Sequence, residues 1–157
     1  MKIGVTILAA GSSKRMGNQN KLLLLVNNKP ILYILCKSVL KADINQVVLV
    51  TGYQKKKIEN VLPNGIDTIV HNEHWGKGMM SSIHVGISNL QHDIDANMII
   101  LGDMPLIKTN TINRIICAFN NNKGKYWMFK LGVLKRNFKI FQYRRSYLLM
   151  ERQSHSS

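Results

Sequence analysis

An apolar, β-branched run opens the chain at residues 5–10 and predicts a buried strand. The run ends in Gly11, Ser12 and Ser13. Small residues after a strand allow a ligand to come close to the backbone amides. The hydrophobic pattern therefore predicts a strand that leads directly into a ligand-binding loop.

Three more apolar runs have the length of strands. Residues 46–51 and 97–101 predict buried strands, and residues 66–70 predict a weaker one. Helix-like spacing of apolar and polar residues predicts helices at residues 31–42, 55–62, from about 80 onward, and at 109–122. Strands and helices thus alternate along most of the chain.

This alternation predicts an α/β fold with a mostly parallel sheet, helices on both faces and right-handed crossovers. The expected architecture is a Rossmann-like three-layer α/β/α domain. Ligands of such sheets bind beyond the carboxyl ends of the strands. The loop at residues 10–13 lies at that edge.

Length and cysteine content agree with one domain that needs no disulfide. The chain has 157 residues and two cysteines, enough length to bury a core without cross-links. Cys36 and Cys117 each lie in an apolar, helix-like run, so we predict that both are reduced core residues. One lysine and then a strand begin the chain, with no long apolar span, so we expect a cytoplasmic protein that does not bind membranes.

The formal net charge of +14 is unevenly distributed along the chain. Residues 126–157 carry seven Lys or Arg against one acidic residue, whereas residues 1–125 carry fifteen against seven. No helix-turn-helix pattern and no aromatic RNA-binding strand accompanies the charge. We therefore do not expect nucleic acid as the principal partner.

Cations surround the first loop. Lys14, Arg15 and Lys21 follow it closely, and exposed amides near a helix start already favour phosphate groups. We expect a nucleoside triphosphate as the ligand. The spacing matches neither a Walker loop nor Gly-x-Gly-x-x-Gly, because five residues separate Gly11 from Gly17 and no Gly-Lys-Ser/Thr follows.

The segment Leu8 to Gly17, with Asn20-Lys21, resembles the signature of the MobA-like nucleotidyltransferases, which attach a nucleotide to molybdopterin. That signature runs Leu-Ala-Ala/Gly-Gly-x-Ser-x-Arg-Met-Gly and then an Asn/Asp-Lys pair. Ala10 and the Asn-Lys-Leu-Leu-Leu continuation look like the molybdenum cofactor cytidylyltransferase branch. The guanylyltransferase branch more often carries Gly-Gly and Asp-Lys.

A second block, from Asn72 to Ser82, is similar to the family's Asn-x-x-Trp-x-x-Gly-Met-x-x-Ser pattern. The resemblance implies that Asn72, Gly78, Ser81 and Ser82 help to hold the base and ribose. From the residues alone, Ser81 and Ser82 are also good caps for the helix that starts near Met80. Both roles remain open for these two serines.

Asp103 is the candidate metal ligand. It follows a predicted strand, between Gly102 and Pro105, and a carboxylate there suits a hard cation such as Mg²⁺. Taken alone, an Asp-x-Pro segment is more often a plain turn. The string from Leu101 to Leu106 is similar to the family's metal motif. His71 and His74 are interpreted as loop histidines, since no cysteine or third histidine lies at ligand spacing.

The resemblance implies transfer of CMP from CTP to the terminal phosphate of molybdopterin, with release of pyrophosphate and dependence on Mg²⁺. A molybdoenzyme of the xanthine dehydrogenase type is an expected partner. Arg15, Lys21 and Asp103 are the expected catalytic residues. The expected nucleotide-binding residues are Leu8, Ala9, Ala10, Gly11, Ser12, Ser13, Lys14, Arg15, Lys21, Asn72, Gly78, Ser81 and Ser82.

Three alternatives stay open at this point. The first is a guanylyltransferase of the same family. The second is a transferase that acts on a sugar phosphate or alditol phosphate. The third is a nucleotide-binding remnant without turnover, because the family's second metal carboxylate and its acceptor loop find no match in the sequence.

The motifs stop at about residue 125. We assign residues 1–125 to the nucleotide-binding domain and residues 126–157 to an atypical basic tail. The family's Gly-x-Pro loop and later Gly-Asp segment find no match there, and we expect a frameshifted, truncated or degenerate end. The competing hypothesis is a basic, aromatic extension at Phe129 to Leu149 that lies on RNA, DNA or an anionic surface.

Overall fold

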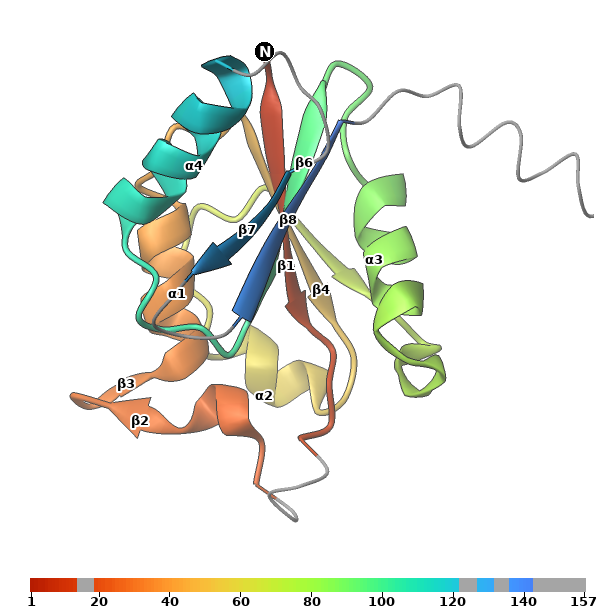
Figure 1. Cartoon of the computed structure of the whole chain (residues 1–157). Coiled ribbons are helices and arrows are strands. Elements are labelled where there is room, and N and C mark those ends of the chain that lie inside the picture. The colour runs from red at the N-terminus through yellow and green to blue at the C-terminus, as the bar shows by residue number, and fades with distance from the viewer. Residues whose placement is uncertain (14–18, 122–126, 132–135, 143–157) are drawn as a thin grey trace, which may run out of the picture.

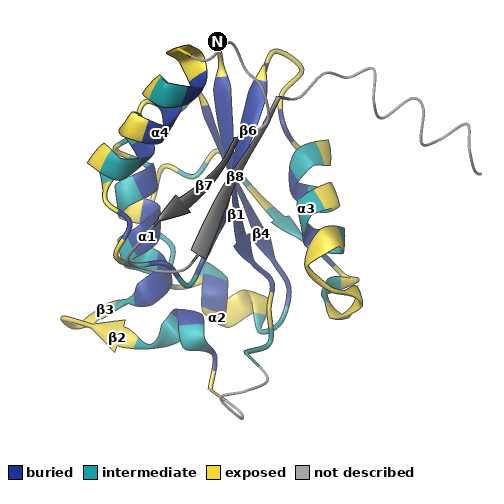
Figure 2. Cartoon of the chain, viewed as in Figure 1, coloured by how far each residue is buried: buried dark blue, intermediate teal, exposed yellow. Residues whose placement is uncertain are grey.

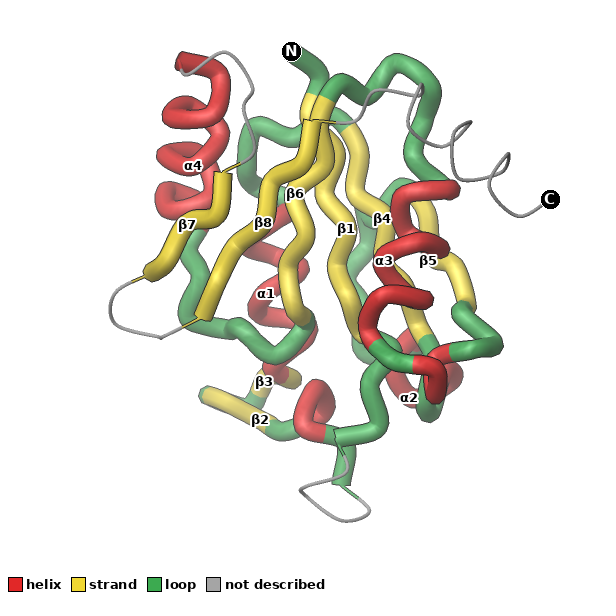
Figure 3. The backbone as a smooth tube through the Cα atoms, turned by 45° about the vertical axis from the view of Figure 1, so that its right-hand side comes forward, coloured by secondary structure: helices red, strands yellow, loops and turns green. Residues whose placement is uncertain are grey.

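A computed structural model describes residues 1–13, 19–121, 127–131 and 136–142, the last two segments by their backbone. Strand β1 (Ile3–Ala9) lies inside a six-stranded sheet with the order β5-β4-β1-β6-β8-β7. Figure 3 shows this sheet as a continuous layer. The predicted strand-to-loop segment is therefore the centre of the fold.

The parallel part of the sheet contains the four predicted strands. β1 pairs in parallel with β4 (Gln46–Thr51) and with β6 (Ala96–Leu101), and β4 pairs in parallel with β5 (Thr68–His71). The carboxyl ends of these four strands therefore point to one edge. The predicted mostly parallel α/β fold is confirmed.

Two antiparallel strands complete the sheet at one side. β7 (Trp127–Leu131) pairs with β8 (Arg136–Gln142), and β8 pairs antiparallel with β6. Both strands lie after residue 125, where the sequence motifs end. The basic segment after residue 125 thus adds two antiparallel strands to one edge of the parallel sheet.

Helices cover both faces of the sheet. α1 (Ile31–Val39), α2 (Lys55–Glu59) and α4 (Thr109–Asn121) contribute buried residues to one apolar cluster, whereas α3 (Met79–Ser88) lies on the other face. Figure 1 shows α1 and α4 on one side of the strands and α3 opposite them. Three layers result, as predicted. No helix in the described residues is long and apolar enough to cross a membrane.

Side chains of β1 alternate between the two apolar clusters. Val5 and Ile7 pack toward α1 and α4, whereas Leu8 packs toward α3. All seven residues of β1 are buried, as are all residues of β4 and those of β6 except Leu101, which is half-buried (Figure 2). A strand that is apolar on both faces is typical of a sheet covered on both sides.

The segment after the first loop forms a small ribbon. A short 3-10 helix, η2 (Lys21–Leu23), precedes β2 (Leu25–Val26) and β3 (Lys29–Pro30), which pair antiparallel. Asn27 and Asn28 connect them with φ angles of 50° and 59°. Asparagine tolerates positive φ at both positions of such a hairpin turn.

The prediction for one of the two cysteines was wrong. Cys36 is buried in α1, but Cys117 is exposed on α4. The buried residues of α4 are Ile112, Ile115, Ile116 and Phe119. They follow the spacing of one helix face, and Cys117 lies outside that face.

Candidate nucleotide-binding site

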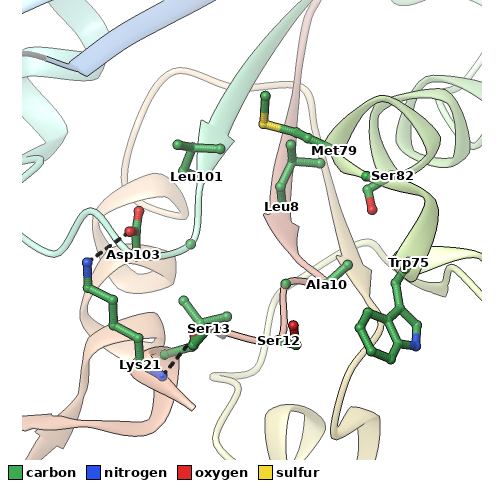
Figure 4. A pocket seen from close by; sticks show the side chains of 15 residues that line it. Leu8, Ala10, Ser12, Ser13, Lys21, Trp75, Met79, Ser82, Leu101 and Asp103 are labelled. Atoms are coloured by element: carbon green, nitrogen blue, oxygen red, sulfur yellow. Dashed lines mark hydrogen bonds and ion pairs between the residues drawn. The ribbon is translucent and has the colours of Figure 1, made fainter. Parts of the chain in front are cut away.

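A cavity of about 410 Å³ opens at the carboxyl edge of the sheet, between the ends of β1 and β6 and the start of α3. Figure 4 shows it with the charged pair Lys21 and Asp103 on one side and Trp75 and Ser82 on the other. The residues that line it are Leu8, Ala10, Gly11, Ser12, Ser13, Lys21, Leu22, Trp75, Gly76, Gly78, Met79, Ser82, Leu101, Gly102 and Asp103.

Neighbouring strands fix the start of the first loop. The backbone nitrogen of Gly102 donates to the carbonyl oxygen of Leu8 at 2.9 Å, and that of Tyr53 donates to Ala10 at 3.1 Å. Gly52 makes this approach possible, because an added Cβ would lie 2.7 Å from the Ala10 oxygen. The loop therefore leaves the sheet from a rigid base, with Gly11, Ser12 and Ser13 at the cavity.

The loop closes on η2 through a hydrogen bond. The backbone nitrogen of Lys21 donates to Ser13 Oγ at 3.2 Å, and Ser13 has a φ of 50°. Asn20, which is buried, caps η2 by accepting from the Leu22 nitrogen at 3.1 Å. These contacts hold Lys21 beside the loop.

Lys21 and Asp103 meet at the charged side of the cavity. Lys21 Nζ donates to Asp103 Oδ2 at 3.1 Å, and the two side chains are 35% and 24% exposed. Asp103 follows the end of β6 after Gly102, and Lys21 comes from the segment after β1. The parallel order of β1 and β6 therefore brings the predicted cation and the predicted carboxylate together.

The residues present suit a Mg²⁺ ion that a nucleotide brings with it. Asp103 supplies a carboxylate oxygen at the cavity, and Mg²⁺ uses one or two carboxylates together with phosphate oxygens. In the described part of the chain, no group of three or more His, Cys, Asp or Glu residues is placed to hold a metal. The donor set fits a metal that is shared with a ligand rather than a closed metal cage.

The other side of the cavity is uncharged. The 3-10 turn η3 (Trp75–Lys77) and the start of α3 bring Trp75, Met79 and Ser82 to its wall. The Trp75 ring packs against Tyr53, with 5.5 Å between ring centroids. Gly78 joins the two elements with a φ of 104°, a left-handed conformation that favours glycine.

Most of the residues expected from the sequence meet at this cavity. Those that line it are Leu8, Ala10, Gly11, Ser12, Ser13, Lys21, Gly78, Ser82 and Asp103. Ala9 is buried in β1, and Asn72 and Ser81 lie behind the wall without lining it. Lys14 and Arg15 fall outside the described residues. The expected residues did not include Leu22, Gly76, Leu101 or Gly102, which also line the cavity. Trp75 and Met79 line it too; they belong to the block at residues 72–82 that resembles the family pattern, but they were not among the expected binding residues.

Neither serine caps α3. Ser81 Oγ lies 2.9 Å from the carbonyl oxygen of Gly78 and 3.1 Å from that of His74, and its one hydrogen can be donated to either. α3 has no side-chain cap. Both serines instead accept a hydrogen bond from Asn72. Asn72, Ser81 and Ser82 thus form a hydrogen-bond network of their own.

His71 makes a 3.4 Å contact through Nδ1 to Thr51 Oγ1.

Solved structures show which class of fold this is. The chain superposes on Rv0371c from Mycobacterium tuberculosis H37Rv with a TM-score of 0.77 at 22% identity, covering 96% of this chain and 75% of that one. A manganese complex of Rv0371c superposes with a TM-score of 0.72 at 19% identity, covering 96% and 74%. The 4-diphosphocytidyl-2C-methyl-D-erythritol synthase of Anaerococcus prevotii gives 0.69 at 18% identity, covering 99% and 76%. The fold is that of the α/β nucleotidyltransferases.

The sequence identifies the family. The MobA-like NTP transferase domain matches residues 5–151, and the chain belongs to this family. The match continues beyond residue 125, where the quoted motifs end. The 2-C-methyl-D-erythritol 4-phosphate cytidylyltransferase of Lachnoclostridium phytofermentans is 31% identical over 129 residues, which are 78% of this chain. The chain spans 54% of that relative's length.

Proposed function

We propose that the chain is a Mg²⁺-dependent nucleotidyltransferase that transfers CMP from CTP to a phosphate-bearing acceptor. The observation that carries this proposal is the shared cavity of the first loop, Lys21 and Asp103. Amides, a cation and one carboxylate form a site that can neutralise a triphosphate. Family membership supports the same activity.

The chain's own groups would act on the triphosphate. The small loop at residues 10–13 would donate backbone hydrogen bonds to the β- and γ-phosphates, and Lys14 and Arg15 are proposed to add positive charge there. Lys21 would contact the α-phosphate. An acceptor phosphate oxygen attacks the α-phosphorus, the bond to the bridging oxygen of the β-phosphate breaks, and pyrophosphate leaves.

Asp103 would hold the Mg²⁺ ion. When bound, the ion supplies a positive charge that neutralises the phosphate oxygens during transfer. Lys21 would stabilise the charge that develops at the α-phosphate. No side chain needs to act as a nucleophile, because positioning and charge neutralisation account for this kind of catalysis.

For the acceptor we propose molybdopterin, with a molybdoenzyme of the xanthine dehydrogenase type as the recipient of the product. Support comes from the resemblance of the first loop to the molybdenum cofactor cytidylyltransferases. An alditol phosphate is the second candidate, because the relative from Lachnoclostridium phytofermentans acts on 2-C-methyl-D-erythritol 4-phosphate. The two acceptors share a terminal phosphate as the attacking group.

Pyrophosphate release tests the function. The full chain is incubated with Mg²⁺ and each of CTP, GTP, UTP and ATP, with either molybdopterin or 2-C-methyl-D-erythritol 4-phosphate. We expect release with CTP and one of the acceptors, and none with the acceptor left out. CTP binding without release in any mixture would instead identify a nucleotide-binding remnant.

A further inference from the structure

Asn72 is almost completely buried behind the cavity wall, with 2% of its surface exposed. Its Oδ1 accepts from the backbone nitrogen of His74 at 2.9 Å. A backbone N–H can only donate, so the atom that faces it must be the amide oxygen. The orientation of the Asn72 amide is therefore determined, and its two N–H groups point the other way.

Each of those N–H groups donates to a serine. Asn72 Nδ2 lies 2.9 Å from Ser81 Oγ and 2.9 Å from Ser82 Oγ. The Ser81 hydroxyl donates its own hydrogen bond to the carbonyl oxygen of Gly78 or His74. The Ser81 hydroxyl is therefore fully used inside the protein.

Ser82 differs from Ser81 in one respect. It is 4% exposed and lines the cavity, and its hydroxyl hydrogen has no protein acceptor within the described segments. Its oxygen already accepts from Asn72. Ser82 is thus a buried hydroxyl that offers a hydrogen-bond donor to whatever fills the cavity.

This donor lies at the uncharged side of the cavity. Figure 4 shows the Ser82 oxygen on the side of Trp75, away from Lys21 and Asp103. If the phosphates occupy the charged side, the nucleobase lies beside Trp75, Met79 and Ser82. A base there meets an aromatic ring, an apolar side chain and one hydroxyl donor.

We infer that Asn72 is a positioning residue that orients the Ser82 hydroxyl as a donor to the 2-carbonyl oxygen of a pyrimidine base. Adenine has no carbonyl group, so ATP would lack this particular contact. This inference rests on the proposed function, because it takes a nucleoside triphosphate as the ligand. It assigns part of the selection of the base to Asn72, a residue that does not line the cavity.

The test compares CTP with 2-thio-CTP, which differs in the one atom that Ser82 would contact, and sulfur is a weak acceptor. Dissociation constants are measured by calorimetry on the full chain with Mg²⁺. We expect the wild type to bind CTP about 5-fold more tightly than 2-thio-CTP, the size of one neutral hydrogen bond. The ratio should fall to about one in Ser82→Ala.

Two Asn72 variants test the relay. In Asn72→Asp the carboxylate can only accept, so it draws the Ser82 hydrogen away from the cavity and the ratio should again be about one. The added charge affects both nucleotides equally and cancels in the ratio. Asn72→Ala removes the donor without adding charge and should also lower the ratio. Circular dichroism checks that each variant is folded.

Ser88→Ala is the matched control, because Ser88 is an exposed residue of the same helix and does not line the cavity. It should keep the wild-type ratio. A folded Ser82→Ala variant with the wild-type ratio would overturn the inference and leave the proposed function intact. A wild-type chain that binds neither nucleotide would overturn both.

Discussion

Lys21 Nζ lies 3.1 Å from Asp103 Oδ2, which joins the segment after β1 to the carboxyl end of β6. A partly exposed ion pair of this kind contributes about 0–1 kcal/mol to stability. A ligand that brings phosphate to Lys21 and a divalent metal to Asp103 would replace this pair at little cost. The ion pair therefore holds both side chains at the cavity, and it is weak enough for a nucleotide with its metal to replace it.

Asp103→Asn should abolish the tightening of CTP binding by Mg²⁺, because the amide is a poor substitute for a carboxylate ligand. The measurement is a CTP titration with and without Mg²⁺. Asp93→Asn serves as the control, since Asp93 is exposed and pairs with Lys2. An unchanged Mg²⁺ response in Asp103→Asn would remove Asp103 from the site.

Lys21→Gln should lower kcat about 100-fold or more, the size expected when one group that stabilises developing charge is lost. The KM for CTP should change less, because the loop amides would still bind the β- and γ-phosphates. Steady-state pyrophosphate release gives both constants. Lys37→Gln, at an exposed position of α1, should behave as the wild type. A variant at Lys21 with normal kcat would exclude it from catalysis.

Gly86→Ala should lower the free energy of unfolding by about 2 kcal/mol, because the overpacked contact costs up to about 3 kcal/mol and the gain in helix propensity returns about 1 kcal/mol. An added Cβ would lie 2.3 Å from Thr6 Cγ2 on β1, so α3 would have to move away from the sheet. Urea unfolding of Gly86→Ala and of Gly76→Ala, which has nothing within 4 Å of the added Cβ, makes the comparison. Equal stability of the two variants would contradict the close packing of α3.

Cys117 and Cys36 should react with a thiol reagent at very different rates. Burial raises the pKa of the Cys36 thiol to about 12, so at pH 8 it stays protonated as well as shielded. Cys117 is exposed. We expect one fast thiol in the native chain, two after unfolding, and none fast in Cys117→Ser. Rapid labelling of the native Cys117→Ser chain would mean that Cys36 is accessible.

The parallel sheet could be predicted because each strand is an apolar run of the right length. The run at 46–51 coincides with β4, and the carboxyl-edge rule placed Asp103 beside the first loop. Helix ends were less predictable. α2 ends at Glu59 rather than at residue 62, because the nitrogens of Val61 and Leu62 donate three residues back and the helix tightens into a turn.

The placement of Asn72 could not be predicted from the motif. A resemblance to a nucleotide-binding pattern does not tell whether an amide lines the cavity or instead contacts the residues that line it. The same holds for Trp75 and Met79, whose positions at the wall depend on η3 and on the positive φ of Gly78. These contacts arise from tertiary packing, which a local pattern does not encode.

The exposure of Cys117 was within reach of the sequence. The apolar positions of α4 that face the core follow spacings of three and four residues, at 112, 115, 116 and 119. Position 117 does not belong to that series. Assigning each residue of the run to a face of the helix predicts that Cys117 is exposed, whereas the apolar character of the whole run does not.

We expect one cavity to hold both the triphosphate and its metal. A crystal structure of the full chain with CTP and Mn²⁺, in which the anomalous signal locates the metal, would show whether it does. We predict the triphosphate over residues 10–13 and beside Lys21, with the metal on the Asp103 carboxylate and the base beside Trp75 and Ser82. A triphosphate bound outside this cavity, or a metal without contact to Asp103, would rule out a shared site.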